Sequence, residues 1–333
     1  MSKVQVSAAH GRPLASPRVA LLEVAPRPDV AALATLVRAV SAEHADVPGQ
    51  DAPVVTPHAQ HPARRVAASI AAFDAGRWAE ARGLMAAETS PAAGSWAAWS
   101  AFLLRAAGWP DQAIKVADTA IAAAGRDGEA AAPWRMARAA ALLDVGRTTE
   151  ARLEALALSG IGGPSAPSRL WDLTCAEVLV MAAVHDGDAA AVAARAGDAR
   201  RMASSVVPRV RAMGAWLAAV IADSQGDADV TSGALGAITV PPAGRTARYA
   251  GMALRTGRRD LAATAATAAE RYAALNPEYP LLRAEALHAR GLVDCAAPPV
   301  ARAARILSGL GLPLARAAAL QDAARLSGGC DSA

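Results

Sequence analysis

The sequence has few of the residues that build β-sheets, and it has no long apolar run. Aromatic residues make up only 4% of the 333 residues, and β-branched strand formers are sparse. No uninterrupted apolar segment reaches the roughly 18–20 residues that span a bilayer. The opening residues, MSKVQVSAAHGRP, lack the apolar stretch of a secretory signal. These absences argue against a sheet protein and a membrane protein, and we expect a cytoplasmic chain.

Lysine and cysteine are also scarce. Of the 34 basic residues, 32 are arginine, and the only lysines are Lys3 and Lys115. Neither lysine lies in a G-x-x-x-x-G-K-[ST] phosphate-binding loop. The three cysteines, Cys175, Cys295 and Cys330, are far apart and form no C-x-x-C pair, so neither a zinc site nor a redox pair is indicated. Reduced thiols fit a cytoplasmic protein.

Motifs that carry catalytic or metal chemistry are absent as well. No G-x-S-x-G elbow suits a serine hydrolase. His58 and His61 are three residues apart but have no third ligand nearby. The pair Glu285-x-x-His288 has the spacing of di-iron bundles, which need two such motifs and two further carboxylates. We therefore predict no catalytic residue, no metal site, no cofactor and a non-enzymatic protein.

The charge balance is mild, because 34 positive residues face 30 negative ones and the net charge is +4. Residues 241–333 hold twelve arginines and seven carboxylates, spread along the segment. A nucleic-acid reader usually concentrates basic residues on one face. We expect no direct nucleic-acid binding.

What the sequence has in abundance is alanine, with 93 residues. Alanine favours the helix more than any other residue, which predicts an all-α fold. Residues 1–62 hold eight of the 21 prolines, so we expect a loosely ordered segment there with one short helix over residues 29–43. We assign residues 63–328 to a helical domain and residues 329–333 to a tail.

Helical segments in that domain are separated by short breaks whose sequences resemble one another. The breaks read GRWAEA, GWPDQA, GRTTEA and GRRDLA, with weaker copies GDAAAV and GDADVT. The glycines that open them are 31 to 41 residues apart, a period typical of helical-hairpin solenoids. Glycine ends the first helix in a left-handed conformation, and the small residue five positions later lets two helices approach closely. The glycines are Gly76, Gly108, Gly146, Gly187, Gly226 and Gly257.

These residues resemble the tetratricopeptide repeat family. The family's small position in the first helix is matched by Ser69, Ala101, Ala139 and Ala250, and its tight position in the second helix by Ala81, Ala113, Ala151 and Ala262. Val192 and Thr231 depart from the tight position, and most of the family's first-helix aromatic residues are missing. The resemblance implies a right-handed α-solenoid of about seven hairpins plus a terminal helix.

The C-terminal part has a narrower resemblance. Residues 284–292 read AEALHARGL and residues 311–319 read GLPLARAAA, which is similar to the last repeats of large LuxR-type regulators of high-GC bacteria. Those regulators carry a nucleotide-binding domain, a helical-repeat sensor and a helix-turn-helix. Only the repeat segment is recognised in this chain, which implies a sensor or interaction module of a transcription-related protein.

In the tetratricopeptide family the first helices of successive hairpins line a concave groove. The matching positions are mostly apolar, apart from Arg105, Glu177 and Asp223. We predict a protein or peptide partner in this groove, with a small ligand as the alternative, and expect no membrane association. The candidate anchors are Phe102, Arg105, Met136, Met181 and Trp216.

Three other interpretations of the groove stay open. Its apolar residues could simply be core, or the apolar residues 19–24 and 30–40 could occupy it. It could also hold an unrecognised site of an enzyme or of a small-molecule-binding protein. A catalytic groove should gather titratable residues with perturbed pKa values, which is the feature that distinguishes the last interpretation.

A repeat array stacks each hairpin only on its neighbours, so one hairpin cannot bury its apolar stripe alone. Deletion of one central hairpin, such as the unit around Gly187, should therefore remove more helix than the deleted residues contain. Far-ultraviolet circular dichroism and a thermal melt measure this loss. An unchanged melting temperature, with only the deleted residues' share of the signal missing, would contradict the prediction.

Overall fold

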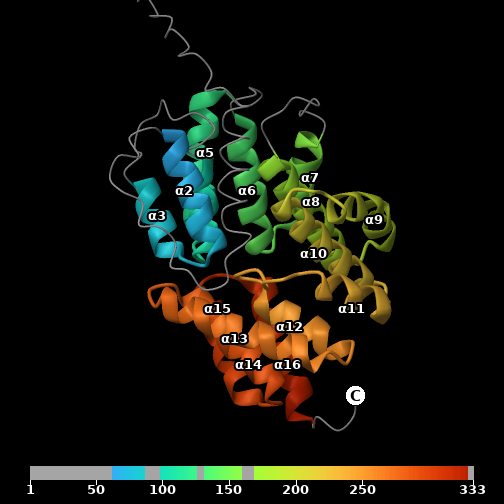
Figure 1. The fold of residues 1–333 in the computed structure, drawn as a ribbon. Coiled ribbons are helices and arrows are strands. Elements are labelled where there is room, and N and C mark those ends of the chain that lie inside the picture. The colour runs from blue at the N-terminus through green and yellow to red at the C-terminus, as the bar shows by residue number, and fades with distance from the viewer. Residues whose placement is uncertain (1–61, 87–97, 126–130, 160–168, 329–333) are drawn as a thin grey trace, which may run out of the picture.

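A computed structural model describes residues 62–86, 98–125, 131–159 and 169–328. Within these ranges the chain forms fifteen α-helices and no strand, which confirms the all-α prediction (Figure 1). The helix predicted over residues 29–43 and the stretches 19–24 and 30–40 lie outside the described residues.

The helices follow one another along the chain with short connections. Their bounds are α2 (Pro62–Asp74), α3 (Trp78–Ala86), α4 (Ala98–Ala106), α5 (Pro110–Ala124), α6 (Ala132–Asp144), α7 (Thr148–Leu158), α8 (Arg169–His185), α9 (Ala189–Ala203), α10 (Pro208–Ser224), α11 (Ala228–Gly236), α12 (Thr246–Arg255), α13 (Arg259–Leu275), α14 (Pro280–Val293), α15 (Ala297–Gly309) and α16 (Pro313–Ser327).

Consecutive helices pack as pairs, from α2 with α3 to α14 with α15, and α16 follows as a single helix. Most first helices also contact the first helix of the next pair, as α4 contacts α6 and α6 contacts α8. This is the neighbour-to-neighbour packing of stacked hairpins, and it agrees with the expected helical-repeat architecture. The right-handed sense of the solenoid stays a prediction.

The turn glycines have the conformation that the repeat pattern requires. All six have a positive φ, between 68° and 87°. At Gly76 a side chain is also sterically excluded, because a Cβ atom would lie 2.3 Å from Cδ1 of Tyr272. Cys295 takes the corresponding place between α14 and α15 with φ 51°, and it is the one described non-glycine residue with a positive φ.

The small residues predicted at the helix crossings are completely buried. They are Ser69, Ala81, Ala101, Ala113, Ala139, Ala151, Ala250 and Ala262. The two exceptions to the pattern, Val192 and Thr231, are buried as well, so α8/α9 and α10/α11 are hairpins with a larger residue at the crossing. The backbones also approach closely between these two hairpins, since a Cβ at Gly214 of α10 would lie 2.1 Å from the backbone N of Ala203 of α9.

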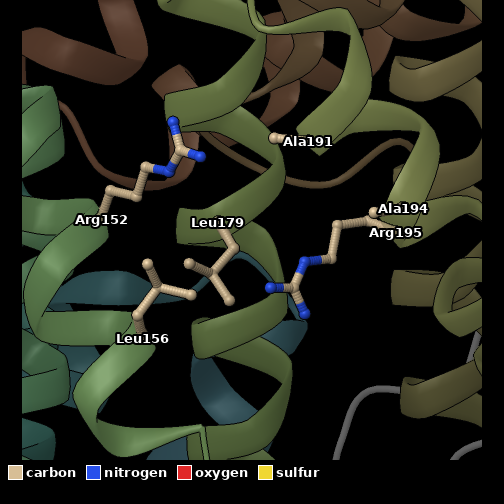
Figure 2. Close-up of a pocket in the computed structure, with 6 residues that line it drawn as sticks. All are labelled: Arg152, Leu156, Leu179, Ala191, Ala194 and Arg195. Carbon is tan, nitrogen blue, oxygen red and sulfur yellow. The ribbon is translucent and has the colours of Figure 1, made fainter.

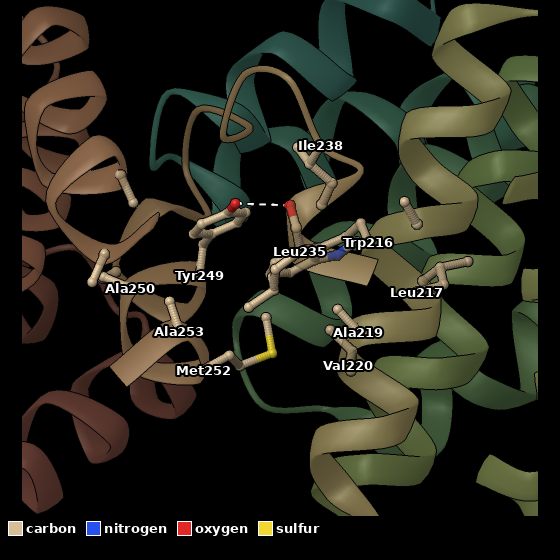
Figure 3. Close-up of a cluster of buried hydrophobic side chains, with 14 of the residues drawn as sticks. Trp216, Leu217, Ala219, Val220, Leu235, Ile238, Tyr249, Ala250, Met252 and Ala253 are labelled. Carbon is tan, nitrogen blue, oxygen red and sulfur yellow. Dashed lines mark hydrogen bonds between the residues drawn. The ribbon is translucent and has the colours of Figure 1, made fainter. Parts of the chain in front are cut away.

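The largest core cluster joins α8–α14 (Figure 3). Its bulky members Trp216, Leu235, Tyr249 and Met252 are buried, and the Tyr249 hydroxyl donates to the Leu235 carbonyl at 2.9 Å. The indole Nε1 of Trp216 is buried without a hydrogen-bond partner among the described residues. The core therefore contains large side chains as well as alanines, although the high alanine count alone suggests a core of small side chains.

One buried amide joins the first hairpin to the sixth. Asn276 is fully buried, and its Oδ1 accepts hydrogen bonds from the backbone N–H groups of Trp78 at 2.7 Å and Ala79 at 3.1 Å. Its Nδ2 donates to the carbonyls of Gly76 at 2.6 Å and Tyr272 at 2.8 Å. Asn276 therefore caps the N-terminus of α3 from a position about 200 residues away along the chain.

Further contacts join the first hairpins to the last helices, and we call this set of contacts the closure. Leu281 and Leu310 lie against Gly108, in the second hairpin turn, and Pro313 lies against Gly146, in the third. The turns of the first three hairpins therefore rest on the last helices, and in Figure 1 α12–α16 lie beneath α2–α7.

Replacing Asn276 by alanine should destabilise the protein far more than removal of an ordinary cap. The change leaves two backbone N–H groups and the Gly76 carbonyl unsatisfied in the interior, and we expect a loss of about 3 kcal/mol of unfolding free energy. The matched control is Asp227→Ala, which removes a local cap on Val230 N and should cost about 1 kcal/mol. Urea unfolding measures both. Equal losses in the two variants would show that the closure adds nothing beyond one cap.

Candidate functional site

Ion pairs join several first helices on one face of the array, which we call the inner face. Asp74 at the end of α2 pairs with Arg209 at the start of α10, with Oδ2 and Nη1 3.2 Å apart. Glu177 of α8 pairs with Arg245, which directly precedes α12. These pairs join hairpins that are not neighbours in the array. We call the nine charged residues that meet here the inner-face cluster: Asp74, Arg105, Asp144, Glu177, Arg209, Asp223, Arg245, Arg248 and Arg255.

Four arginines of the cluster pair one-to-one with its four carboxylates. Arg105 binds Asp144 with two hydrogen bonds of 2.6 and 3.1 Å. Arg255 binds Asp223 in the same two-pronged way, with both bonds 2.9 Å long. The other two pairs are the Asp74–Arg209 and Glu177–Arg245 bridges. The fifth arginine, Arg248, is the exception among the described residues.

Part of the cluster is open to water. The Asp74 side chain keeps 48% of its surface exposed. Burial nevertheless raises the pKa of Asp74, and the charge of Arg209 only partly opposes this. Asp74 therefore keeps contact with water, although the surrounding protein disfavours its charged form.

The Arg105–Asp144 pair is set deeper. Burial raises the pKa of Asp144, Arg105 opposes the rise, and the like charge of Glu177 adds to it. Burial alone would lower the pKa of Arg105, but the charges of Asp144 and Glu177 and the hydrogen bond to Asp144 raise it overall. The two directions are compatible, because the arginine gains from two nearby carboxylates while those carboxylates repel each other.

Three of the arginines lie over the faces of aromatic rings. The guanidinium carbon of Arg245 lies 5.7 Å from the ring centre of Trp216, and that of Arg105 lies 5.7 Å from Phe102. Arg209 lies 6.0 Å from the ring centre of Trp99. Each ring face attracts the positive charge, which holds these side chains towards the inner face.

The five predicted groove anchors divide into two groups. Phe102, Met136 and Trp216 are 6%, 2% and 2% exposed, so they are core residues, as one of the alternative interpretations proposed. Phe102 and Trp216 contribute to the inner face only because an arginine lies over each ring, and Met136 packs against α7 and α8. Arg105 and Met181 are partly exposed on the inner face itself.

Most of the charged residues were missed by the sequence analysis. The predicted groove rows contained Arg105, Glu177 and Asp223, whereas the structure adds Asp74, Asp144 and four more arginines to the same face. A sequence signal for part of this set does exist. An ionisable residue lies two or three positions before each turn glycine, at the end of each first helix. These residues are Asp74, Arg105, Asp144, His185, Asp223 and Arg255.

A small cavity on α7, α8 and α9 is a weaker candidate (Figure 2). Arg152, Leu156, Leu179 and Arg195 line it together with two alanines, and its volume is about 60 Å³. Sites for drug-sized ligands enclose roughly 300–1,000 Å³. Arg152 is also engaged by Asp188 at 3.0 Å, so this cavity does not offer a built ligand site.

Neither a metal site nor a membrane span appears in the part of the chain that the structure describes. No group of three or more His, Cys, Asp or Glu side chains lies close enough there to hold a metal ion. No helix in the described ranges has both the length and the apolar composition needed to cross a bilayer. Comparison with protein-family models, curated proteins and solved structures gives no match. The inner face is therefore the candidate functional site.

The raised pKa of Asp144 predicts a specific pH dependence. A carboxyl group whose pKa is higher in the folded than in the unfolded chain costs stability once the pH rises above its ordinary value of 3.8. The unfolding free energy of Asp144→Asn, measured relative to that of the original protein, should therefore increase as the pH rises from about 3.5 to 7. Urea unfolding across this range measures the difference.

The control for this experiment is Asp188→Asn. A hydrogen bond from Ala191 N and the contact with Arg152 lower the pKa of Asp188, so its ionised form stabilises the folded chain. Asp188→Asn should lose relative stability over the same rise in pH. Parallel trends in the two variants would contradict the electrostatic assignment of the inner face.

Proposed function

We propose that this chain is a non-enzymatic interaction or sensor module that binds a partner or ligand at its inner face. The observation that carries the proposal is that charged side chains from the first six hairpins meet on one partly open surface. Partly buried ion pairs cost desolvation and bring little stability, which supports a role for this surface in binding.

Binding is favoured over catalysis by the state of the cluster's side chains. Each of its four carboxylates is engaged by an arginine, which leaves none of them free to act as a base. The cluster also has no hydroxyl, thiol or amine that could serve as a nucleophile.

One observation favours the alternative of an enzyme or small-molecule-binding protein. The inner face does gather titratable groups with perturbed pKa values, since burial raises the pKa of Asp74 and of Asp144. Such shifts also arise in structural ion-pair networks. They give weight to a small ligand over a large folded partner.

A regulatory context for this module rests on the resemblance to the repeat segments of LuxR-type regulators. In such a tetratricopeptide-like sensor, occupation of the inner face would change how hairpins stack, and the change would pass along the array. We place this chain in a transcription-related protein on that basis.

The proposal is tested by capture from an extract of the native host with the full chain as bait, followed by affinity measurement on each captured component. Met181→Arg places a charge and a long side chain on the inner face and should weaken binding at least tenfold, or by about 1.4 kcal/mol. The matched control is Leu153→Arg on α7, where the side chain is 63% exposed, and it should leave the affinity unchanged.

Val184→Arg, one turn further along α8, serves as the second variant if Met181→Arg does not fold by circular dichroism. A partner that binds both inner-face variants as tightly as the original protein would contradict the proposal. So would a partner whose binding is lost only in Leu153→Arg.

A further inference from the structure

Arg248 is the arginine of the inner-face cluster without a carboxylate partner. No described carboxylate lies within ion-pair distance of its guanidinium, whose Nη1 donates instead to the Sδ of Met181 at 3.4 Å. A thioether sulfur is a weak acceptor. Four of the five donors of this arginine therefore have no acceptor among the described residues.

The surroundings balance the charge of Arg248 only in part. Burial lowers its pKa and the neighbouring charge of Arg255 adds to the lowering, whereas the carboxylates of Asp223 and Glu177 oppose it. Burial also lowers the pKa of His185, and the positive charge of Arg248 lowers it further, although Asp186 acts in the opposite direction. A guanidinium stays protonated in proteins, so a positive charge persists here.

Apolar side chains lie beside this charge. Met181 lies in contact with Arg248, and Val184 is one turn further along the same helix, α8. Both apolar residues are partly buried and pack against the large core cluster, leaving part of their surface exposed.

We propose that Arg248 binds the carboxylate of a small organic acid whose apolar part packs on Met181 and Val184. This inference rests on the proposed function and specifies its ligand class. An arginine fork matches the two oxygens of a carboxylate, and pairing would supply the counter-charge that the folded chain leaves out.

The charges around the site favour a single negative charge on the ligand. Glu177 and Asp223 both act on Arg248, and they would repel a dianion such as a phosphate monoester more strongly than a carboxylate. The Glu177–Arg245 bridge joins α8 to the start of α12, next to this site.

The test uses the full chain and three probes with the same number of carbon atoms in isothermal titration calorimetry. Octanoate should bind at least tenfold more tightly than octanamide, which has the same shape without the charge. Octanoate should also bind more tightly than octyl phosphate. Arg248→Gln should weaken octanoate binding at least tenfold, and Arg248→Lys should restore part of it, because lysine keeps the charge but not the fork.

The matched control is Arg259→Gln, at an exposed arginine that begins α13, and it should leave octanoate binding unchanged. Equal binding of octanamide, tighter binding of octyl phosphate, or unchanged octanoate binding in Arg248→Gln would overturn the carboxylate inference while inner-face binding stands. Binding of an acidic peptide with no response to octanoate would overturn it too. Failure of all three probes would overturn it as well, while the proposed function is decided separately by the Met181→Arg capture experiment.

Discussion

The side chain of Asn276 supports the curvature of the whole array. It satisfies two N–H groups at the start of α3 and one carbonyl of the first turn, across about 200 residues. Each bond by itself has a modest net value, but the buried groups it satisfies would be costly if they were left without partners. The first hairpin is therefore held against the sixth, and the row of first helices between them has to bend.

The inner face is a consequence of that bend. Asp74 reaches Arg209, and Glu177 reaches Arg245, only because helices several hairpins apart are brought to face each other. Partly buried ion pairs of this kind add little to stability, because each charge loses water before it gains its partner. Their one-to-one matching instead fixes which helices face each other, and it leaves Arg248 as the charge that the chain itself does not match.

The repeat architecture was readable from the sequence because its requirements are local. A positive φ at a turn favours glycine, and two helices can cross closely only at a small residue, so both marks recur at each hairpin. Val192 and Thr231 made two units look weaker than they are, since a valine or a threonine can also be buried at a crossing. The seventh turn was not predicted, because Cys295 takes the left-handed conformation there and a cysteine in the sequence does not indicate that conformation.

The candidate site was predicted less completely. Periodicity placed Phe102, Met136 and Trp216 on first helices, but it could not distinguish a groove wall from a core, since both need apolar residues at the same spacing. The ionisable residue before each turn glycine was visible in the sequence, although nothing there said which charges would pair.

The sequence by itself determined the helices, the turns and the close crossings, because these depend on residues within one or two hairpins. Only the tertiary structure decided the closure by Asn276, the pairing of the inner-face charges and the isolation of Arg248. Those contacts join residues that are 32 to 200 positions apart. No local pattern encodes them, because they depend on the curvature that the stacked array adopts as a whole.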